Sequence, residues 1–185
     1  GVQTCALPIF SEYSEKLPFP DNSFDVINCR QVLHHARELP QTCREIFRVL
    51  KPGGRMIATR EHVISKSEDL PKFLEAHPLH HLYGGENAFR LDQYTAALTS
   101  AGLRIQQTLG PLDSVINYFP MTPDQRFEYC IRPVRVLMGH RLASIICNPA
   151  HRFGKWLSSC LFQMHRHLDH TPGRLYSFVV EKPVL

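Results

Sequence analysis

Ionisable side chains directly follow one short apolar stretch of the sequence, residues 56–59, and such side chains can bind a ligand or move a proton. They are Arg60, Glu61 and His62. A carboxylate next to an imidazole is an arrangement that general acid–base chemistry uses often. We therefore expect Arg60 and His62 to take part in a reaction. Glu61 and His62 would act together as a general base near the acceptor. The alternative is that they form a solvated strand end.

A pair of adjacent histidines, His34 and His35, lies earlier in the chain. An imidazole changes its charge close to neutral pH, so either ring could transfer a proton. Helix packing and capping, or the lining of a binding site, are the alternatives for this pair. Of the two, we expect His35 to be the catalytic one.

A dense polar and aromatic segment covers residues 77–90 and has no hydrophobic period. Such a segment is typical of a loop that carries function. We predict that it contacts a substrate through Tyr83, Asn87 and Arg90, with the packing of a lid as the alternative. The segment also offers His80, His81 and Glu86, but adjacent histidines point apart and no fixed helical spacing supports a metal site. We expect no bound metal.

The elements that must position these residues follow from the apolar pattern. Residues 24–29 and 56–59 are apolar runs of the kind that form buried strands, and residues 40–50 have the period of an amphipathic helix. The run Lys51–Gly54, with its proline and glycines, should end that helix. A strand, a helix and a second strand form a right-handed crossover, so the two strands should lie parallel in an α/β sheet.

The second half of the sequence adds a helix over residues 91–101, a strand over 103–109 and a last strand over 175–181. Between the last two strands lies an insertion in which residues 132–174 carry a net charge of +6. Its apolar stripe predicts two or three helices that pack over the edge of the sheet or over a site. We therefore divide the chain into an N-terminal artefact (1–9), a core (10–120), a helical insertion or lid (121–173) and the last core strand (174–185).

Four interpretations of the basic insertion stay open. It could be a lid over an acidic or lipid-like ligand, an amphipathic surface for anionic lipid, a nucleic-acid surface, or a solvated face. The interleaving of aromatic and basic residues that stacks bases is missing. We therefore do not expect nucleic acid as a partner, and we keep peripheral membrane contact as a possibility.

The composition excludes several classes of protein. The chain has 185 residues, a net charge of +4 and 43% hydrophobic residues, which is typical of one globular domain. No apolar run reaches the roughly 18–20 residues that a membrane-spanning helix needs. The six cysteines show no metal-binding or redox spacing, so we expect reduced and mostly buried thiols. Without a recognisable secretory leader, we expect a cytoplasmic location.

Three sequence blocks resemble those of the class I S-adenosylmethionine-dependent methyltransferases. The blocks are Glu15–Ile27, which contains Leu-Pro-Phe-Pro-Asp-Asn-Ser-Phe-Asp, then Val32–His35, then Arg44–Arg55, which contains Leu-Lys-Pro-Gly-Gly-Arg. The resemblance covers residues 12–110 and 175–183. It implies a partial Rossmann-like fold, with parallel strands four and five of the family followed by a terminal strand pair.

The resemblance also implies S-adenosylmethionine as the cofactor. Ligands in an open parallel sheet lie beyond the carboxyl ends of the strands, which places three consecutive residues at the cofactor: Cys29, Arg30 and Gln31. The loop before this strand would lie beside the adenine and would contribute Tyr13, Ser14 and Leu17. Tyr13 stands where many relatives have an acidic residue.

The glycine-rich loop that the family uses for its cofactor has no counterpart in this sequence. We expect the chain to be the C-terminal two-thirds of the enzyme, with residues 1–9 derived from a sequencing adapter and cofactor binding impaired. The predicted function is methyl transfer from S-adenosylmethionine to a small-molecule or lipid-like acceptor. The alternative is a non-catalytic interaction or membrane-surface module on a partial methyltransferase fold.

Overall fold

A mixed β-sheet forms the centre of the computed structural model, which describes residues 14–184. Its strands run in the order β1 (Phe24–Arg30), β2 (Leu50–Ile64), β5 (Arg174–Glu181) and β4 (Arg104–Leu109). β1 and β2 are parallel, whereas β5 is antiparallel to both β2 and β4. A short strand, β3 (Phe89–Arg90), pairs with the end of β2. The predicted parallel crossover and the α/β class are confirmed.

Helix α1 (Leu39–Val49) links β1 to β2 and buries Cys43, Ile46 and Val49 against the sheet. Pro40 stands in its first turn, where the missing N–H costs nothing. The helix ends as predicted, but residues 51–54 belong to β2 itself and do not form a separate turn. The Lys182 ammonium closes the helix end, because it donates to the carbonyl oxygens of Phe47 and Leu50 at 2.9 and 2.8 Å.

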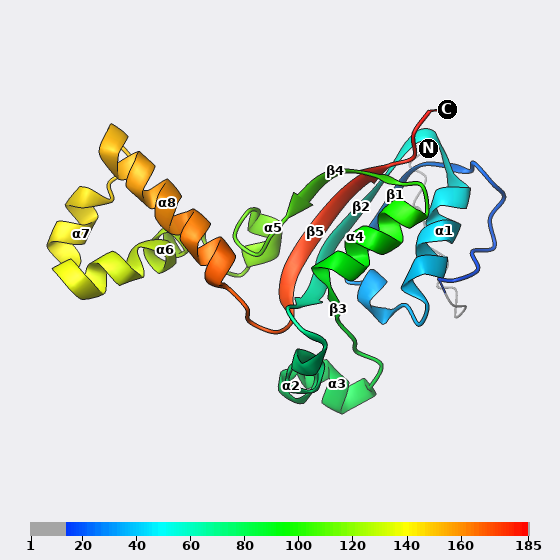
Figure 1. The fold of residues 1–185 in the computed structure, drawn as a ribbon, viewed down its shortest axis with the longest axis horizontal. Helices are drawn as coiled ribbons and strands as arrows, with labels where there is room; N and C mark the ends of the chain where they lie inside the picture. Colours follow the sequence, from blue (N-terminus) through cyan, green and yellow to red (C-terminus); the bar gives the residue numbers. More distant parts are fainter. Residues whose placement is uncertain (1–13, 185) are drawn as a thin grey trace, which may run out of the picture.

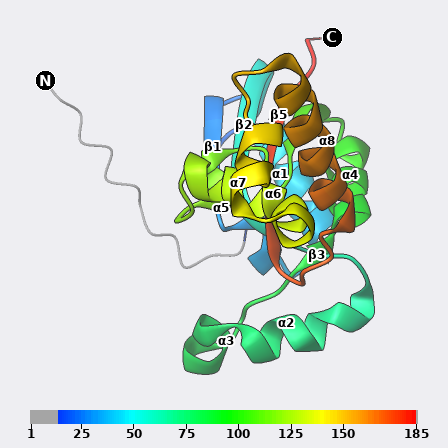
Figure 2. The ribbon, with the colours of Figure 1, turned by 90° about the vertical axis from the view of Figure 1, so that its left-hand side faces the viewer.

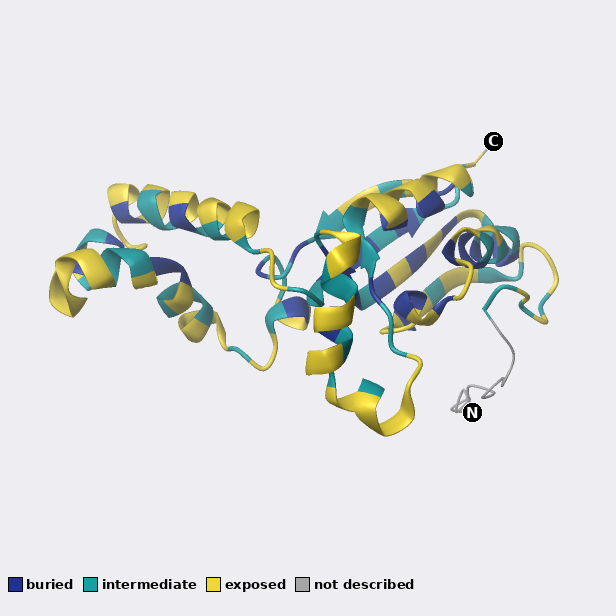
Figure 3. Cartoon of the chain, turned by 60° about the horizontal axis from the view of Figure 1, so that its bottom comes forward, coloured by how far each residue is buried: buried dark blue, intermediate teal, exposed yellow. Residues whose placement is uncertain are grey.

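The main core lies between the sheet and two helices, α1 and α4 (Leu91–Ser100), which cover the same face (Figure 1). Tyr94 of α4 and Phe178 of β5 are fully buried, with ring centroids 5.3 Å apart. Gly102 follows α4 with a φ of +92°, a backbone conformation that favours glycine, so the chain reverses there into β4. Figure 3 shows the dark, buried residues concentrated where these helices meet the strands.

Residues 65–88 form a small helical unit below the sheet (Figure 2). It contains a 3₁₀ turn (Ser67–Asp69), helix α2 (Leu70–Ala76) and helix α3 (Pro78–Tyr83). Ile64, Phe73 and Ala88 form its own apolar cluster. The expectation of a loop over residues 77–90 was therefore wrong for Pro78–Tyr83, where a proline in the first turn starts a short helix without an amphipathic period.

The predicted helical insertion contains α6 (Pro123–Met138), α7 (His140–Ile146) and α8 (Arg152–Leu168), preceded by the short helix α5 (Val115–Tyr118). The three longer helices share a separate apolar cluster around Ile131, Cys147 and Leu161. They extend away from the sheet as an arm (Figure 1) and do not pack over its edge as expected. A cluster of their own makes that possible: Leu161 of α8 is buried in it, whereas Trp156 and Leu168 of the predicted stripe stay exposed.

The described helices include none that is both long and apolar enough to cross a lipid bilayer.

Two adjacent positions of β2 provide a test of the core. Met56 is fully buried, whereas Ile57 is 38% exposed on the opposite face of the strand. We expect Met56→Ala to lower the free energy of unfolding by about 2–5 kcal/mol, through lost burial and the cavity that remains. Ile57→Ala is the matched control and should cost less. Denaturant titrations of both variants measure this difference, and equal losses would contradict the assignment of faces.

Candidate functional site

The site lies where β2 continues beyond the end of β1. The parallel pairing stops at Arg30 and Thr59, and the register with β5 shifts between Ala58 and Glu61. Arg60 in this bulge has a φ of +61°. A bulge re-aims the side chains that follow it, and here Glu61 and His62 are both buried. The strand predicted over residues 56–59 therefore extends to Ile64, and Arg60–His62 lie inside it.

The Glu61 carboxylate is fully buried and holds the turn that follows β1. It accepts hydrogen bonds from the backbone N–H groups of Val32 and His34, both at 3.1 Å, and from the His34 Nδ1–H at 2.8 Å. His34 belongs to the 3₁₀ turn η1 (Leu33–His35) and is 1% exposed. The imidazole therefore carries its proton on Nδ1, and Nε2 faces away from Glu61.

The His62 imidazole is oriented in the same way. Its Nδ1 lies 2.8 Å from the carbonyl oxygen of Gly173, which can only accept, so Nδ1 carries the proton. Its Nε2 is buried and has no hydrogen-bond partner among the described residues. Burial lowers the pKa of His62 to about 4, with a smaller contribution from the nearby His34 and His77 rings. The ring is therefore neutral at physiological pH.

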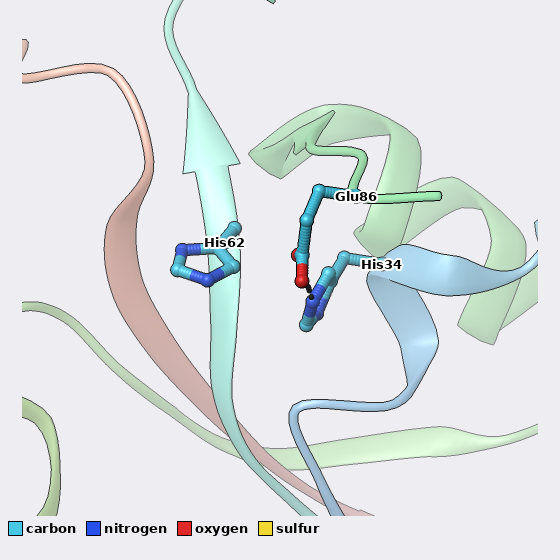
Figure 4. Close-up of side chains that lie close together, drawn as sticks. All are labelled: His34, His62 and Glu86. Carbon is cyan, nitrogen blue, oxygen red and sulfur yellow. Dashed lines mark ion pairs between the residues drawn. The ribbon is translucent and has the colours of Figure 1, made fainter. Parts of the chain in front are cut away.

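Glu86 completes this cluster from the loop between α3 and β3. One of its carboxylate oxygens lies 3.4 Å from His34 Nε2, and its side chain is 8% exposed (Figure 4). His35, the predicted catalytic histidine, is more exposed: its Nδ1 lies 3.0 Å from the carbonyl oxygen of Gly85, and its Nε2 lies 3.9 Å from Glu86. The buried network thus centres on His34, and His35 forms its outer side.

Arg60 points elsewhere. Its guanidinium donates to the carbonyl oxygens of Ile116 and Phe119, at 2.7 and 3.2 Å, so it ties the α5 segment to the sheet. Burial and the Arg30 guanidinium lower the pKa of Arg60. A cleft of about 320 Å³ opens here, lined by Arg30, Arg60, Val115, Ile116 and Phe119. Arg60 and His62 were predicted to act together, but their side chains contact different parts of the site.

The predicted cofactor residues at the end of β1 lie beside this cleft. Arg30 and Gln31 are exposed, and the Gln31 N–H donates to the Thr59 carbonyl oxygen at 2.9 Å. Cys29 is buried, and burial raises the pKa of its thiol to about 12, with a smaller effect of Glu61. Cys29 can therefore offer its backbone and an apolar surface to a ligand, but not a thiolate.

The other predicted cofactor residues lie along α1. Ser14 shares a hydrogen bond of 3.0 Å with Thr42, and the Leu17 N–H donates to the Glu45 carboxylate at 2.9 Å. The neighbouring Glu15 accepts from the backbone of residues 37 and 38, in the connection between η1 and α1. These bonds hold the segment near the end of β1. Tyr13 lies outside the described residues.

The predicted substrate residues do not converge. Tyr83 is 83% exposed on α3. Arg90 pairs with Asp92 at 3.0 Å and donates to the Ser67 hydroxyl at 2.9 Å, so it joins α4 to the 3₁₀ turn before α2. Asn87 is partly buried next to Glu86. Substrate contact by these three residues stays a prediction, and of the three only Asn87 adjoins the buried cluster in sequence.

Sequence reasoning missed Glu86 as a partner of His34 and His62. It grouped Glu86 with His80 and His81, which lie on the exposed helix α3. His34, His62 and Glu86 are far apart in the sequence and reach one another only through η1, the β2 bulge and the loop after α3. The signal that was available was the dense polar composition of residues 77–90.

Residues 4–58 match the family described as a methyltransferase domain. The match ends within β2. It includes the whole of β1 and α1, and with them the carboxyl end of β1 beside the cleft. Residues 4–58 are thus similar to methyltransferase domains. The match begins at residue 4, inside the segment 1–9 that we expected to be an artefact.

Curated relatives of this segment include proteins named as methyltransferases. An uncharacterized methyltransferase, YcgJ, of Bacillus subtilis is 41% identical over 61 residues, which are 33% of this chain and 24% of the relative. The ubiquinone/menaquinone biosynthesis C-methyltransferase UbiE of Pseudoalteromonas translucida is 40% identical over 65 residues, or 32% of this chain and 26% of the relative. The chain thus spans about a quarter of the length of these relatives.

Solved structures show the methyltransferase fold over most of the chain. The (4+2)-cyclase SpnF superposes with a TM-score of 0.52 at 25% identity, over 94% of this chain and 55% of that chain. A candidate sarcosine dimethylglycine methyltransferase from Galdieria sulphuraria has a TM-score of 0.51 at 18% identity, over 94% and 58% of the two chains. These matches extend beyond the segment that the family covers, and they support the fold alone.

The thiols test the burial of this site. Cys29, Cys43, Cys130 and Cys147 are buried and free, whereas Cys160 is exposed. Burial raises the pKa of both Cys29 and Cys43 to about 12. Since the thiolate is the reactive form, we expect iodoacetamide at neutral pH to modify Cys160 and to leave Cys29 and Cys43 intact until the protein unfolds. Peptide mass spectrometry measures this, with Cys160→Ser as the control; early labelling of Cys29 would show an open site.

Proposed function

We propose that the protein is an S-adenosylmethionine-dependent methyltransferase that acts on a small-molecule or lipid-like acceptor. The observation that carries this proposal is the parallel β1–α1–β2 unit, most of which lies in the segment similar to methyltransferase domains, with exposed polar residues at the carboxyl end of β1. Ligands of open α/β sheets bind at this edge.

The cofactor supplies a methyl group on a sulfonium, which is transferred by in-line displacement. Such a step depends on alignment and on the exclusion of water more than on the stabilisation of a new charge. Arg30 and Gln31 are exposed and free to meet a ligand, and buried Cys29 offers a rigid backbone at the same edge. These residues fit one side of a nucleoside-sized ligand, and Ser14 and Leu17 extend that side along α1.

The cleft around Arg30 and Arg60 is the proposed acceptor site. Val115, Ile116 and Phe119 give it an apolar wall, and the two guanidinium groups give it positive charge. This combination suits an amphiphilic acceptor with an acidic or strongly polar group. Two relatives are named for C-methylation in ubiquinone/menaquinone biosynthesis and for demethylmenaquinone methylation, which supports a lipid-like acceptor.

Proton transfer, where the acceptor requires it, falls to His35. Its ring is 43% exposed and lies at the outer side of the buried network. His62 lies deeper in the buried network, where its ring is neutral and is oriented by the Gly173 carbonyl oxygen. The (4+2)-cyclase SpnF shares the fold, so methyl transfer itself has to be measured.

The first measurement is the binding of S-adenosylmethionine by isothermal titration calorimetry, followed by transfer of a radiolabelled methyl group to a panel of quinones, lipids and small acids. We expect Arg60→Ala to lower turnover by at least about tenfold with little change in cofactor affinity, because loss of its two carbonyl contacts displaces the cleft wall. Arg55→Ala, a surface change on the same strand, is the matched control. A protein that binds no cofactor would refute the proposal.

A second candidate function, a module that binds membrane surfaces, is favoured by the helical arm. Residues 132–174 carry a net charge of +6. Large apolar side chains are exposed on the same helices: Val136, Leu137, Phe153 and Trp156 are each at least 60% exposed. Cationic and apolar side chains together suit the surface of an anionic bilayer.

Vesicle co-sedimentation tests this second function. We expect the protein to bind vesicles that contain anionic phosphatidylserine and to release them as the salt concentration rises. Lys155→Glu on α8 should weaken binding several-fold, whereas Lys72→Glu on α2 is a matched charge reversal that should not; both residues are exposed. Equal binding to neutral and anionic vesicles would exclude the electrostatic mechanism.

A further inference from the structure

Three ligand-type side chains converge in the buried cluster of Figure 4. His34 comes from η1, His62 from β2 beyond the bulge, and Glu86 from the loop before β3. One donor atom from each lies within 4.8 Å of the other two. We propose that His34, His62 and Glu86 bind a divalent transition-metal ion of the zinc type. This inference does not depend on methyl transfer.

The tautomers of both histidines suit metal binding. Imidazole ligands of metals usually donate their second N–H to a carboxylate or to a backbone carbonyl, which fixes the ring and leaves the other nitrogen free. His34 donates from Nδ1 to Glu61 at 2.8 Å, and His62 donates from Nδ1 to the Gly173 carbonyl at 2.8 Å. His62 therefore presents an unprotonated Nε2 to the cluster, and His34 directs its Nε2 at the Glu86 carboxylate, with one carboxylate and one carbonyl as outer partners.

The His62 Nε2 atom is an orphaned polar group. The residue is 8% exposed, and this nitrogen has no hydrogen-bond partner among the described residues. A buried polar atom without a partner is costly and calls for an explanation such as an ion. A metal ion between His62 and His34 supplies the missing partner; an ion pair between His34 and Glu86 alone does not.

The charge in the cluster also favours a cation. Glu61 is fully buried and the Glu86 side chain is 8% exposed. Across residues 14–184, the ion pairs of these two carboxylates involve only histidines, with no lysine or arginine. Buried charges are normally paired or coordinate metals. Two carboxylates can balance the charge of one divalent ion.

The distances fit a tetrahedral site after a small adjustment. Ligands that lie about 2.0–2.1 Å from a tetrahedral zinc ion are about 3.3 Å from one another. The His34 Nε2 and Glu86 carboxylate oxygen are 3.4 Å apart. All three donor atoms lie within 4.8 Å of one another, so the His62 donor has to approach the other two for all three to bind one ion.

The ligand set points to the class of metal. Imidazole nitrogens suit Zn²⁺, Fe²⁺, Co²⁺ and Ni²⁺, whereas Mg²⁺ and Ca²⁺ prefer oxygen ligands. Two histidines and one carboxylate leave a coordination position open, as in catalytic rather than structural zinc sites. From the sequence, no metal was expected, because the histidines near Glu86 in the chain are His80 and His81, whereas the tertiary structure brings His34 and His62 to Glu86.

The test measures metal binding directly. The purified protein, stripped with a chelator, is titrated with Zn²⁺, and Co²⁺ is added as a spectroscopic probe of four-coordinate geometry. We expect about one equivalent of tightly bound Zn²⁺ and much weaker binding of Mg²⁺. Glu86→Gln, an isosteric change in a loop, should weaken Zn²⁺ binding by more than about 100-fold, and Glu61→Gln, which alters an outer partner, by roughly 10- to 100-fold.

The control is His81→Gln, which removes an exposed imidazole on the neighbouring helix α3; it should bind Zn²⁺ like the parent protein. X-ray absorption of the zinc complex should report two imidazole ligands, and only one in His62→Ala. Circular dichroism of the metal-free variants identifies any that fail to fold, and Glu86→Gln decides the question if His62→Ala does not fold. The proposal is overturned if the parent protein binds no zinc, if Glu86→Gln binds it equally well, or if His81→Gln removes it.

Discussion

The buried carboxylate of Glu61 is the interaction on which the site depends. It joins the turn after β1 to the extension of β2 through two backbone N–H groups and the His34 ring. A buried carboxylate without such donors is strongly destabilising, and each donor left unpaired costs about 1–3 kcal/mol. Glu61, Val32 and His34 therefore form one structural unit, and the geometry of the turn, the histidine tautomer and the end of β1 depend on one another.

The bulge at Arg60 explains why one strand serves two sites. In a regular strand, successive side chains point to opposite faces, so Arg60 and His62 would share one face. The positive φ of Arg60 breaks that alternation. Arg60 then faces α5 and the cationic cleft, while Glu61 and His62 face the buried cluster. Backbone strain of this kind is found next to functional sites more often than elsewhere.

The helical arm and the sheet have separate apolar cores. The α6–α8 cluster is formed around Ile131, Cys147 and Leu161, and the sheet core around Tyr94 and Phe178. One fold can host different reactions, as the shared fold with a (4+2)-cyclase illustrates. The side chains at the end of β1 and β2, and not the arrangement of the strands, therefore determine what this protein does.

The sequence alone determined the elements and the core of the crossover. Apolar periodicity located β1, α1, α4, β4 and β5 to within one or two residues, because the spacing of buried side chains is a local property of a helix or strand. The cysteine spacing predicted mostly buried thiols, which Cys29, Cys43, Cys130 and Cys147 are and Cys160 is not. The blocks at residues 15–27 and 44–55 indicated the similarity to methyltransferases, since they are contiguous stretches.

Which residues meet at the site depends on the tertiary structure alone. His34, His62 and Glu86 meet because a bulge, a 3₁₀ turn and a loop end at one point, and no local pattern encodes such an encounter. The extension of β2 beyond Thr59 and the short helix α3 depend in the same way on the partners they pack against. The sequence also did not predict that the arm extends away from the sheet. An amphipathic stripe indicates that one face of a helix packs against another element, but it does not identify that element.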